Sequence, residues 1–298
     1  MSKSVVGMIG LGIMGSAMST NLIKDGFTVV GYDVDDDCVE KHVKGGGVGA
    51  ASIKEVAEAA EFIFTSLPSV AAFDAVTQGD DGLKAATGTT PVIIEVSTLP
   101  IDVKQRGHDA LKDAGMVMLD CPLSGTGAQA RTKDLVVLGS GDLASYERAV
   151  PVFEGMSRSN HYVGEFGNGS KMKFVANLLV AIHNASAAEA LVLGMKAGLK
   201  PEDIFKVISD GAGSSRMFEI RGPMMVAGDY DDATMKNAVW QKDMRIIADF
   251  ARSMDCPTPL FSTTEPIYQA AMEQGFDAKD TASICAVMEA MAGLPERK

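Results

Sequence analysis

A lysine and an asparagine stand four residues apart in a segment that could carry out acid–base chemistry. The segment begins with a glycine-rich turn over residues 164–169, and Ser170 is the expected cap of the helix of about 25 residues that follows. Lys173 and Asn177 would be one helical turn apart and would project from the same face. A lysine followed one turn later by an amide, at the start of a buried helix, is a candidate site. The alternative is a lysine that extends to solvent and an asparagine that pairs with a neighbouring carbonyl.

The same helix is expected to connect two domains. Its apolar content predicts burial on most sides, and we place it over residues 164–197. Four polar residues, Asn177, His183, Asn184 and Glu189, interrupt the apolar run. A membrane span would rarely carry them, so we expect no membrane partner.

A second group of residues has the spacing of a dinucleotide-binding loop. An apolar segment fit for a buried strand (residues 5–9) precedes the loop, and a helical segment (residues 16–24) follows it. Three glycines at this spacing allow a tight turn, close approach of the backbone to a pyrophosphate, and close packing of helix on strand. A glycine-rich turn without a ligand is the alternative. The motif consists of Gly10, Leu11, Gly12, Ile13, Met14 and Gly15.

Asp33 indicates which dinucleotide is bound. It stands at the end of the next predicted strand, residues 28–32, where a carboxylate is placed to bind both ribose hydroxyls. A carboxylate there repels a 2′-phosphate, and residues 34–37 contain no arginine. NAD is therefore favoured over NADP.

Composition excludes several classes of protein. The formal net charge of −12 over 298 residues argues against nucleic acid as a partner, because phosphate binding needs the opposite sign. The four cysteines have no metal-ligand spacing and indicate reduced thiols, so we expect a cytoplasmic protein without a metal. No basic and apolar leader is visible at residues 1–4, and no secretory signal is expected.

The fold class expected is α/β. Strands and helices alternate up to residue 163, which predicts a doubly wound, Rossmann-type sheet, and we expect the last strands, 135–139 and 161–163, to be antiparallel. Residues 198–298 have helical patterns only and would form an all-α domain. The expected organisation is therefore a nucleotide-binding domain over 1–163, the interdomain helix over 164–197, and a helical domain over 198–298. Ligands of such sheets lie beyond the carboxyl ends of strands, where the residues found are Leu67, Pro68, Ser97, Thr98 and the loop 121–127.

Four motifs in this order make the chain resemble the β-hydroxyacid dehydrogenase family, which includes 3-hydroxyisobutyrate dehydrogenase, tartronate semialdehyde reductase, threonate dehydrogenase and the larger 6-phosphogluconate dehydrogenases. The glycine motif continues to Met18, and residues 120–126 resemble the substrate motif Asp-Ala-Pro-Val-Ser-Gly-Gly. The pattern G-x-x-G-x-G-x-x-x-K-x-x-x-N is matched in full over residues 164–177. Lys242-Asp243 resembles the lysine–aspartate pair of the family.

The resemblance implies roles for individual residues. Lys173 would be the general acid in reduction and the general base in oxidation, and Asn177 would orient the substrate. Ser124 and Gly125 would bind the substrate carboxylate, and Lys242 would contact cofactor or substrate. Ser97 and Thr98 would lie near the nicotinamide. The implied activity is NAD-dependent interconversion of a small hydroxy acid, of about three to six carbons, and its semialdehyde or keto acid. The resemblance also implies a homo-oligomer, a homodimer or homotetramer.

Substrate identity is left open by departures from the family pattern. Thr126 replaces the usual second glycine and adds a hydroxyl to the carboxylate loop, and residues 129–134 differ from the typical pattern. Arg131 or Lys133 would reach toward a more anionic or longer substrate, although exposed surface charge is the simpler interpretation. Arg216 is a candidate specificity residue, with a surface salt bridge as the alternative.

Three other activities are left open. An NADPH-preferring semialdehyde reductase is disfavoured by Asp33, and an imine reductase by the presence of Lys173. A nucleotide-binding protein without turnover is disfavoured by the intact pair of Lys173 and Asn177, although a fold does not guarantee a function.

Overall fold

The computed structural model describes residues 3–86, 88, 90–295 and 297. By contact density the chain forms two compact units, Met1–Lys173 and Phe174–Lys298. The boundary between the units falls inside one long helix, α8 (Asn168–Lys196). Lys173 is the last residue of unit 1, and Asn177 belongs to unit 2.

Unit 1 contains a parallel sheet of six strands in the order β3-β2-β1-β4-β5-β6. Three of its strands, Val-Val-Gly-Met-Ile, Phe-Ile-Phe-Thr and Val-Ile-Ile-Glu, are almost continuously apolar and buried, as strands covered on both faces require. The strands are β1 (Val5–Ile9), β2 (Thr28–Tyr32), β3 (Val48–Gly49), β4 (Phe62–Thr65), β5 (Val92–Glu95) and β6 (Val117–Asp120).

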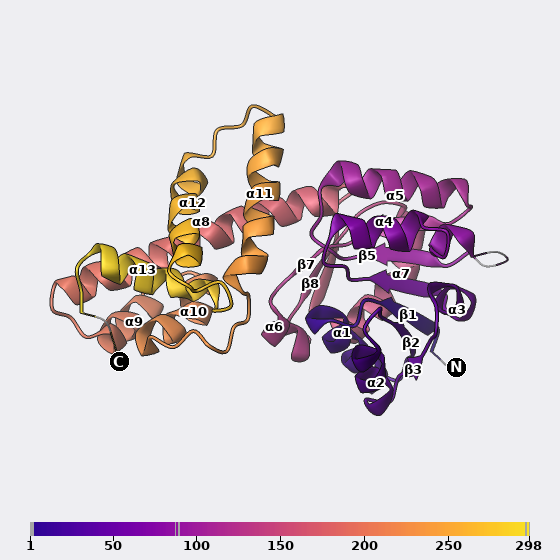
Figure 1. Cartoon of the computed structure of the whole chain (residues 1–298), viewed down its shortest axis with the longest axis horizontal. Helices are drawn as coiled ribbons and strands as arrows, with labels where there is room; N and C mark the ends of the chain where they lie inside the picture. The colour runs from indigo at the N-terminus through magenta and orange to yellow at the C-terminus, as the bar shows by residue number, and fades with distance from the viewer. Residues whose placement is uncertain (1–2, 87, 89, 296, 298) are drawn as a thin grey trace. The chain divides into compact units, whose positions relative to one another are not determined.

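Helices cover both faces of this sheet, and each face has its own core. Side chains of α1 and α7 pack with one set of strand residues, and side chains of α3, α4 and α5 pack with the alternate set. Figure 1 shows α4 and α5 side by side on one side of the strands and α1 on the other. The sheet is therefore doubly wound, as expected. The helices of unit 1 before α8 are α1 (Ile13–Lys24), α2 (Asp36–Lys44), α3 (Ile53–Ala59), α4 (Val70–Gln78), α5 (Ile101–Asp113), α6 (Gly127–Arg131) and α7 (Leu143–Met156), with a 3₁₀ turn at Leu83–Ala85.

A second sheet of three strands corrects one expectation. It consists of β7 (Leu123–Ser124), β8 (Val136–Gly139) and β9 (Ser159–Tyr162), in that order. The predicted antiparallel pairing of the last two strands is wrong: β8 and β9 are parallel, and only β7 and β8 are antiparallel. The reason is α7, which connects β8 to β9 as a crossover and returns the chain to the edge from which β8 started.

The start of α8 also differs from the prediction. The helix begins at Asn168, so Ser170 lies within its first turn and is not the cap. The Ser170 hydroxyl donates instead to Asp120 Oδ1, at 2.8 Å. Within the described part of the chain α8 alone has the length and apolarity of a membrane span, a property that buried helices of soluble proteins share.

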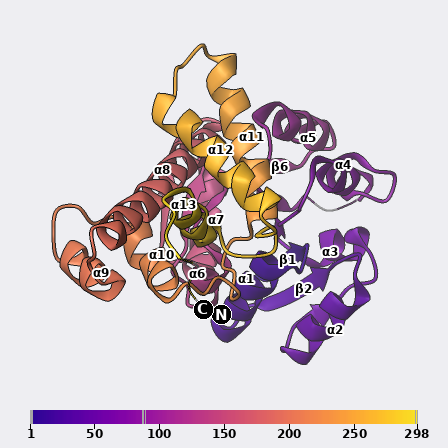
Figure 2. The ribbon, with the colours of Figure 1, turned by 60° about the vertical axis from the view of Figure 1, so that its left-hand side comes forward.

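Unit 2 is helical after α8 and matches the expected all-α region. Figures 1 and 2 both show α11 and α12 side by side, and the buried Trp240 of α11 lies against Tyr268 of α12. The elements are α9 (Pro201–Ser209), α10 (Arg216–Ala227), α11 (Asn237–Ser253), α12 (Pro259–Glu273) and α13 (Ile284–Met291), with a 3₁₀ turn at Thr281–Ser283.

Candidate active site

The glycine motif forms the turn between β1 and α1 (residues 10–12) and the start of α1 (residues 13–15), and its three glycines have different surroundings. Gly10 has φ +91°, and a Cβ atom there would lie 2.2 Å from the Ser66 carbonyl oxygen. At Gly15 a Cβ atom would lie 1.9 Å from the carbonyl oxygen of Gly10. A Cβ atom at Gly12 would meet nothing within 4 Å. Gly12 is also the N-cap residue of α1, and the free backbone N–H groups at the N-terminus of a helix favour a phosphate.

Asp33 lies directly against this loop. Its Oδ2 accepts a hydrogen bond from the Leu11 N–H at 2.6 Å, and its Oδ1 accepts from the Asp35 N–H at 3.0 Å. An ionised carboxylate has about four acceptor sites, so two bonds leave capacity for ribose hydroxyls. The geometry thus joins the two parts of the predicted nucleotide site, residues 10–15 and Asp33, in one place.

The loops after β4 and β5 are joined by Ser97. Its hydroxyl accepts from the Leu67 N–H at 2.8 Å, and its own N–H donates to Glu95 Oε1 at 2.6 Å. Ser97 is buried, whereas Thr98 and Leu67 are half-buried and Pro68 is exposed. The structure therefore brings together the strand-end residues that the sequence predicted separately.

The predicted carboxylate loop lies between β7 and α6. Gly125 has φ +134°, and a Cβ atom there would lie 2.7 Å from Leu135 Cδ2, so a larger residue would displace the loop. The Thr126 N–H donates to Gln129 Oε1 at 3.0 Å, which fixes the start of α6. Lys133, in the segment that departs from the family pattern, has φ +60°, a conformation that favours glycine. Arg131 is exposed.

Lys173 is buried on α8, with 8% of its surface exposed. The turn before it is anchored to the sheet: the Ser170 N–H donates to Asp120 Oδ2 at 2.7 Å, and the Gly169 N–H donates to the Ser140 hydroxyl at 2.9 Å. A Cβ atom at Gly169 would lie 2.5 Å from the Asp120 carbonyl oxygen, so only glycine permits this approach. The first turn of α8 is therefore held in place three residues before the lysine.

In unit 2 the predicted residues Asn177 and Lys242 lie on either side of Asp243. Asn177 Nδ2 donates to Asp243 Oδ2 at 3.0 Å, and Lys242 Nζ lies 3.7 Å from Asp243 Oδ1. Asn177 and Asp243 are both buried, at 5% and 4% exposure. Asp243 thus fixes the orientation of the Asn177 amide, with its nitrogen toward Asp243.

Arg216 is placed differently. It begins α10, its side chain is mostly exposed, and its Nη1 lies 3.4 Å from Glu219 Oε2. The surface salt bridge named as the alternative is therefore present. Phe218, two residues on, is buried and stacks on Phe205 with ring centroids 5.4 Å apart.

Three buried charged residues at the strand ends were not predicted as site residues. Glu95 ends β5, Asp120 ends β6, and Lys104 reaches both from α5. Burial raises the pKa of Glu95, and the nearby Lys104 ammonium opposes that rise. The signal available in the sequence was an acid as the last residue of each of two apolar strands.

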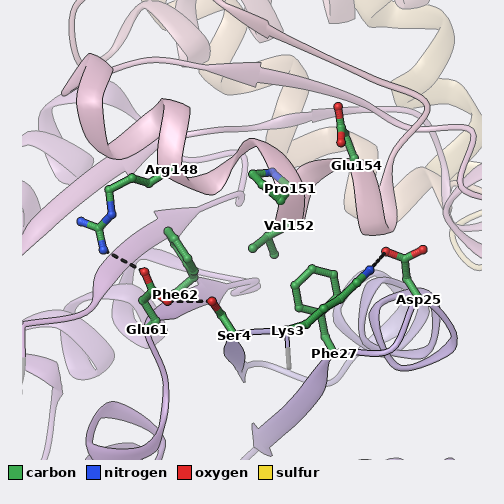
Figure 3. Close-up of a pocket in the computed structure, with 10 residues that line it drawn as sticks. All are labelled: Lys3, Ser4, Asp25, Phe27, Glu61, Phe62, Arg148, Pro151, Val152 and Glu154. Atoms are coloured by element: carbon green, nitrogen blue, oxygen red, sulfur yellow. Dashed lines mark hydrogen bonds and ion pairs between the residues drawn. The ribbon is translucent and has the colours of Figure 1, made fainter. Parts of the chain in front are cut away.

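A cavity in unit 1 lies away from all these residues. It has a volume of about 520 Å³ and is placed at the amino ends of the parallel strands, since Ser4, Phe27 and Glu61 directly precede β1, β2 and β4. The glycine motif follows β1 and lies at the opposite edge of the sheet. Figure 3 shows two ion pairs here, Lys3 with Asp25 at 2.6 Å and Arg148 with Glu61 at 2.9 Å. The lining residues are Lys3, Ser4, Asp25, Phe27, Glu61, Phe62, Arg148, Pro151, Val152 and Glu154.

A doubly wound parallel sheet with a glycine loop after its first strand and an acid after its second defines a dinucleotide-binding protein. Sequence comparison identifies the family. The NAD binding domain of 6-phosphogluconate dehydrogenase matches residues 5–164, and the NAD-binding domain of NADP-dependent 3-hydroxyisobutyrate dehydrogenase matches residues 167–288. The chain belongs to the β-hydroxyacid dehydrogenase family.

Relatives extend over nearly the whole chain. L-threonate dehydrogenase of Cupriavidus necator is 30% identical over 95% of this chain and 95% of its own length. Glyoxylate/succinic semialdehyde reductase 2 of Arabidopsis thaliana, a chloroplastic protein, is 32% identical over 98% of this chain and 81% of its own. The crystal structure of 3-hydroxyisobutyrate dehydrogenase from Salmonella typhimurium superposes with a TM-score of 0.85 at 28% identity, covering 96% of this chain and 100% of that one. The protein is thus an NAD-dependent oxidoreductase that acts on a CH–OH group and interconverts a hydroxy acid with its semialdehyde or keto acid.

Proposed function

We propose that Lys173 is the general acid and base of this reaction. NAD, which residues 10–15 and Asp33 would hold, would supply the hydride-transfer chemistry at the substrate carbon in both directions. In oxidation the neutral Lys173 amine would remove the hydroxyl proton as the carbonyl forms, and in reduction the ammonium would protonate the nascent alkoxide. The observation that carries this proposal is the burial of Lys173 beside the anchored first turn of α8, because it holds the amine in a fixed place.

Asn177 would orient the substrate from the next turn of α8. Asp243 accepts from its amide nitrogen, which leaves the amide oxygen to accept from a substrate hydroxyl. Lys242, beside the same carboxylate, would contact cofactor or substrate.

The substrate would be a small carboxylate bound by the loop between β7 and α6. Ser124 would supply a hydroxyl donor and Gly125 an amide donor, the groups that hold a small anion. Thr126 would add its hydroxyl, which in this structure donates to Gln129 Oε1 at 3.4 Å. The names of two relatives support this class, since L-threonate, glyoxylate and succinic semialdehyde are all small molecules that carry a carboxylate group. Arg216 would be a peripheral specificity residue, because its guanidinium is exposed at the start of α10.

The cofactor would lie along the carboxyl edge of the six-stranded sheet. Residues 10–15 would bind the pyrophosphate and Asp33 the adenosine ribose. Leu67, Pro68, Ser97 and Thr98 would flank the nicotinamide, a role supported by the hydrogen bond between Leu67 and Ser97.

We also propose the organisation of the protein in the cell. The domains would be residues 1–163 and 198–298, with 164–197 as the helix between them. A homodimer or homotetramer is supported by exposed apolar side chains on α8, among them Val175, Leu179 and Leu193 at 54%, 46% and 72% exposure. A cytoplasmic location is supported by four free cysteines.

The test of Lys173 uses the variant Lys173→Met, which keeps the length of the side chain and removes the amine. We expect kcat to fall at least about a hundredfold, because positioned proton transfer contributes about 10²- to 10⁴-fold. The dissociation constant of NADH should change less than about twofold. Lys171→Met is the matched control: Lys171 is exposed on the same helix and bonds to Asn168 at 3.0 Å, so its loss should leave kcat unchanged.

The substrate is found first, by measuring NAD reduction over glycerate, 3-hydroxyisobutyrate, serine, threonate and 4-hydroxybutyrate. Turnover by Lys173→Met within a few-fold of the wild type would overturn the role of the lysine. NADH binding without turnover of any acid in a broad panel would support the non-catalytic alternative.

A further inference from the structure

Three adjacent strands of the six-stranded sheet end on polar residues that face one another. In the strand register Thr65 of β4 is the partner of Glu95 of β5, and Glu95 is the partner of Asp120 of β6. All three are fully buried. Each is followed within a few residues by a loop that the proposed function assigns to the nicotinamide or to the substrate carboxylate.

Lys104 forms ion pairs with the last residues of two of these strands, Glu95 and Asp120. It comes from the first turn of α5 and is fully buried, with Nζ 2.8 Å from Asp120 Oδ1 and 3.8 Å from Glu95 Oε1. Removing one ammonium and two carboxyl groups from water is costly, and an apolar cluster of the same volume is often at least as stable. Stability alone therefore does not account for charged groups at this place.

The network reaches the cofactor side through Glu95. Its Oε1 accepts from the Ser97 N–H at 2.6 Å, and its Oε2 accepts from the Thr65 hydroxyl. Ser97 in turn accepts from the Leu67 N–H at 2.8 Å. The backbone after β4 and the backbone after β5 are thus both fixed with respect to one buried carboxyl group.

Asp120 connects this set of buried groups to α8, the helix that carries Lys173. Its Oδ2 accepts from the Ser170 N–H at 2.7 Å, and its Oδ1 accepts both the Ser170 hydroxyl at 2.8 Å and the Lys104 ammonium. A carboxylate at the N-terminus of α8 also interacts favourably with the positive end of the helix dipole. Lys173 follows Ser170 by three residues.

We propose that Lys104 is a positioning residue for hydride and proton transfer. With Glu95 and Asp120 it sets the distance between the loops that flank the nicotinamide and the helical turn that carries Lys173. This inference depends on the proposed role of Lys173. A misplacement of about 1 Å at a reacting centre can cost about a hundredfold in rate, so a rigid link between the two groups has a kinetic consequence.

The main experiment replaces the ammonium by an apolar group of similar length, Lys104→Met, in the full-length enzyme. We expect kcat to fall at least about tenfold. The dissociation constant of NADH, measured by its fluorescence, should change less than about twofold, because the glycine motif follows β1 and Asp33 follows β2, whereas Lys104 pairs with the ends of β5 and β6. A purely structural role would lower the amount of folded enzyme and leave kcat per folded molecule unchanged.

Arg221→Met is the matched control. Arg221 is also a buried cation, with Nε 3.3 Å from Asp280 Oδ1, and this pair lies in unit 2. We expect this variant to lose stability but to keep its kcat per folded molecule. Equal kcat for Lys104→Met and wild type, or losses of kcat that match in the two variants, would overturn the proposal.

A milder variant covers the case in which Lys104→Met does not fold. Ser170→Ala removes one hydroxyl bond to Asp120 and keeps the backbone bond, so the link to α8 is weakened while the buried charges stay paired. We expect kcat to fall about threefold or more with unchanged NADH affinity, and an unchanged kcat would contradict the proposal. Measuring kcat of Lys173→Met in parallel separates the two hypotheses. If Lys173→Met keeps its activity, the proposed role of Lys173 is overturned. If Lys173→Met is inactive and Ser170→Ala has an unchanged kcat, only the proposed role of Lys104 is overturned.

Discussion

Asp33 shows how one side chain can serve both the structure of a loop and the choice of cofactor. It accepts from the Leu11 N–H and so stabilises the glycine turn, and the same carboxylate would repel a 2′-phosphate. The variant Asp33→Asn keeps the acceptor oxygen and removes the charge. We therefore expect the ratio of kcat/KM for NAD over NADP to fall at least about tenfold, as measured by steady-state kinetics with both cofactors.

Asp35→Asn is the control for this prediction. Asp35 is an exposed carboxylate two residues away that caps α2 by accepting from the Asp37 N–H. A general effect of charge would change the cofactor ratio in both variants, whereas a specific contact at Asp33 changes it in one only. Equal ratios for Asp33→Asn and wild type would contradict the assignment.

Local spacing predicts some site residues and not others, for a physical reason. The three glycines and Asp33 are recognisable because strand, turn and helix geometry fixes their relation along the chain. Lys104 has no such signal, because it meets Asp120 only after α5 has folded back on the sheet. Its fit depends on tertiary packing, and the sequence pattern of α5 resembles that of any amphipathic helix.

Within elements, the orientation of a strand depends on what connects it to its neighbour. The strand predicted at 135–139 is present as β8, whereas β9 begins at Ser159, two residues before the predicted 161–163, and the parallel pairing of the two follows from the crossover helix α7. Likewise Ser170 has the residue type of a helix cap, yet Asp120 competes successfully for its hydroxyl and N–H. Tertiary partners overrode local propensity in both cases.

His42 fixes α2 to its neighbours in a way that depends on pH. Its ring is buried, with Nδ1 3.0 Å from the Ser19 hydroxyl of α1 and Nε2 3.1 Å from the Val29 carbonyl of β2. Burial lowers its pKa below 6.5, the ordinary value. The unfolded chain therefore binds more protons than the folded one as the pH falls below about 6.5, and stability decreases with it.

We expect the melting temperature of the wild type to fall more steeply between about pH 7.5 and pH 5.5 than that of His42→Gln. The contribution of His42 is fully present above the unfolded pKa and is lost as the pH falls toward the folded one. His161→Gln is the control, because His161 is exposed on β9 and its replacement should leave the slope unchanged. Parallel curves for the wild type and His42→Gln would show that the buried ring does not titrate as argued.

At the scale of the whole molecule, the residues proposed to bind the dinucleotide belong to unit 1, apart from Lys242. Unit 2 is stabilised by contacts among its own residues, and those of Arg297 are an example. Arg297 closes the end of the chain on unit 2 by donating to the carbonyls of Met225 and Val226 at 2.6 and 2.8 Å and by pairing with Glu289. Glu289 is nearly buried and also accepts from the Cys285 thiol at 3.4 Å. Removal of the guanidinium would leave this carboxylate without its cation.

Arg297→Met should therefore lower the free energy of unfolding of unit 2 by about 2 kcal/mol, less than for a fully buried pair because Arg297 is partly exposed. The chain has a single tryptophan, Trp240, which is buried in unit 2, so urea unfolding followed by its fluorescence reports on this unit. NADH affinity should stay within about twofold of the wild type, since residues 10–15 and Asp33 are in unit 1.

The control is Arg252→Met, which removes an exposed ion pair with Asp249 and should change the free energy of unfolding by less than about 0.5 kcal/mol. An unchanged urea midpoint for Arg297→Met would contradict the role of the C-terminal contact, and a tenfold loss of NADH affinity would show that dinucleotide binding depends on the integrity of unit 2.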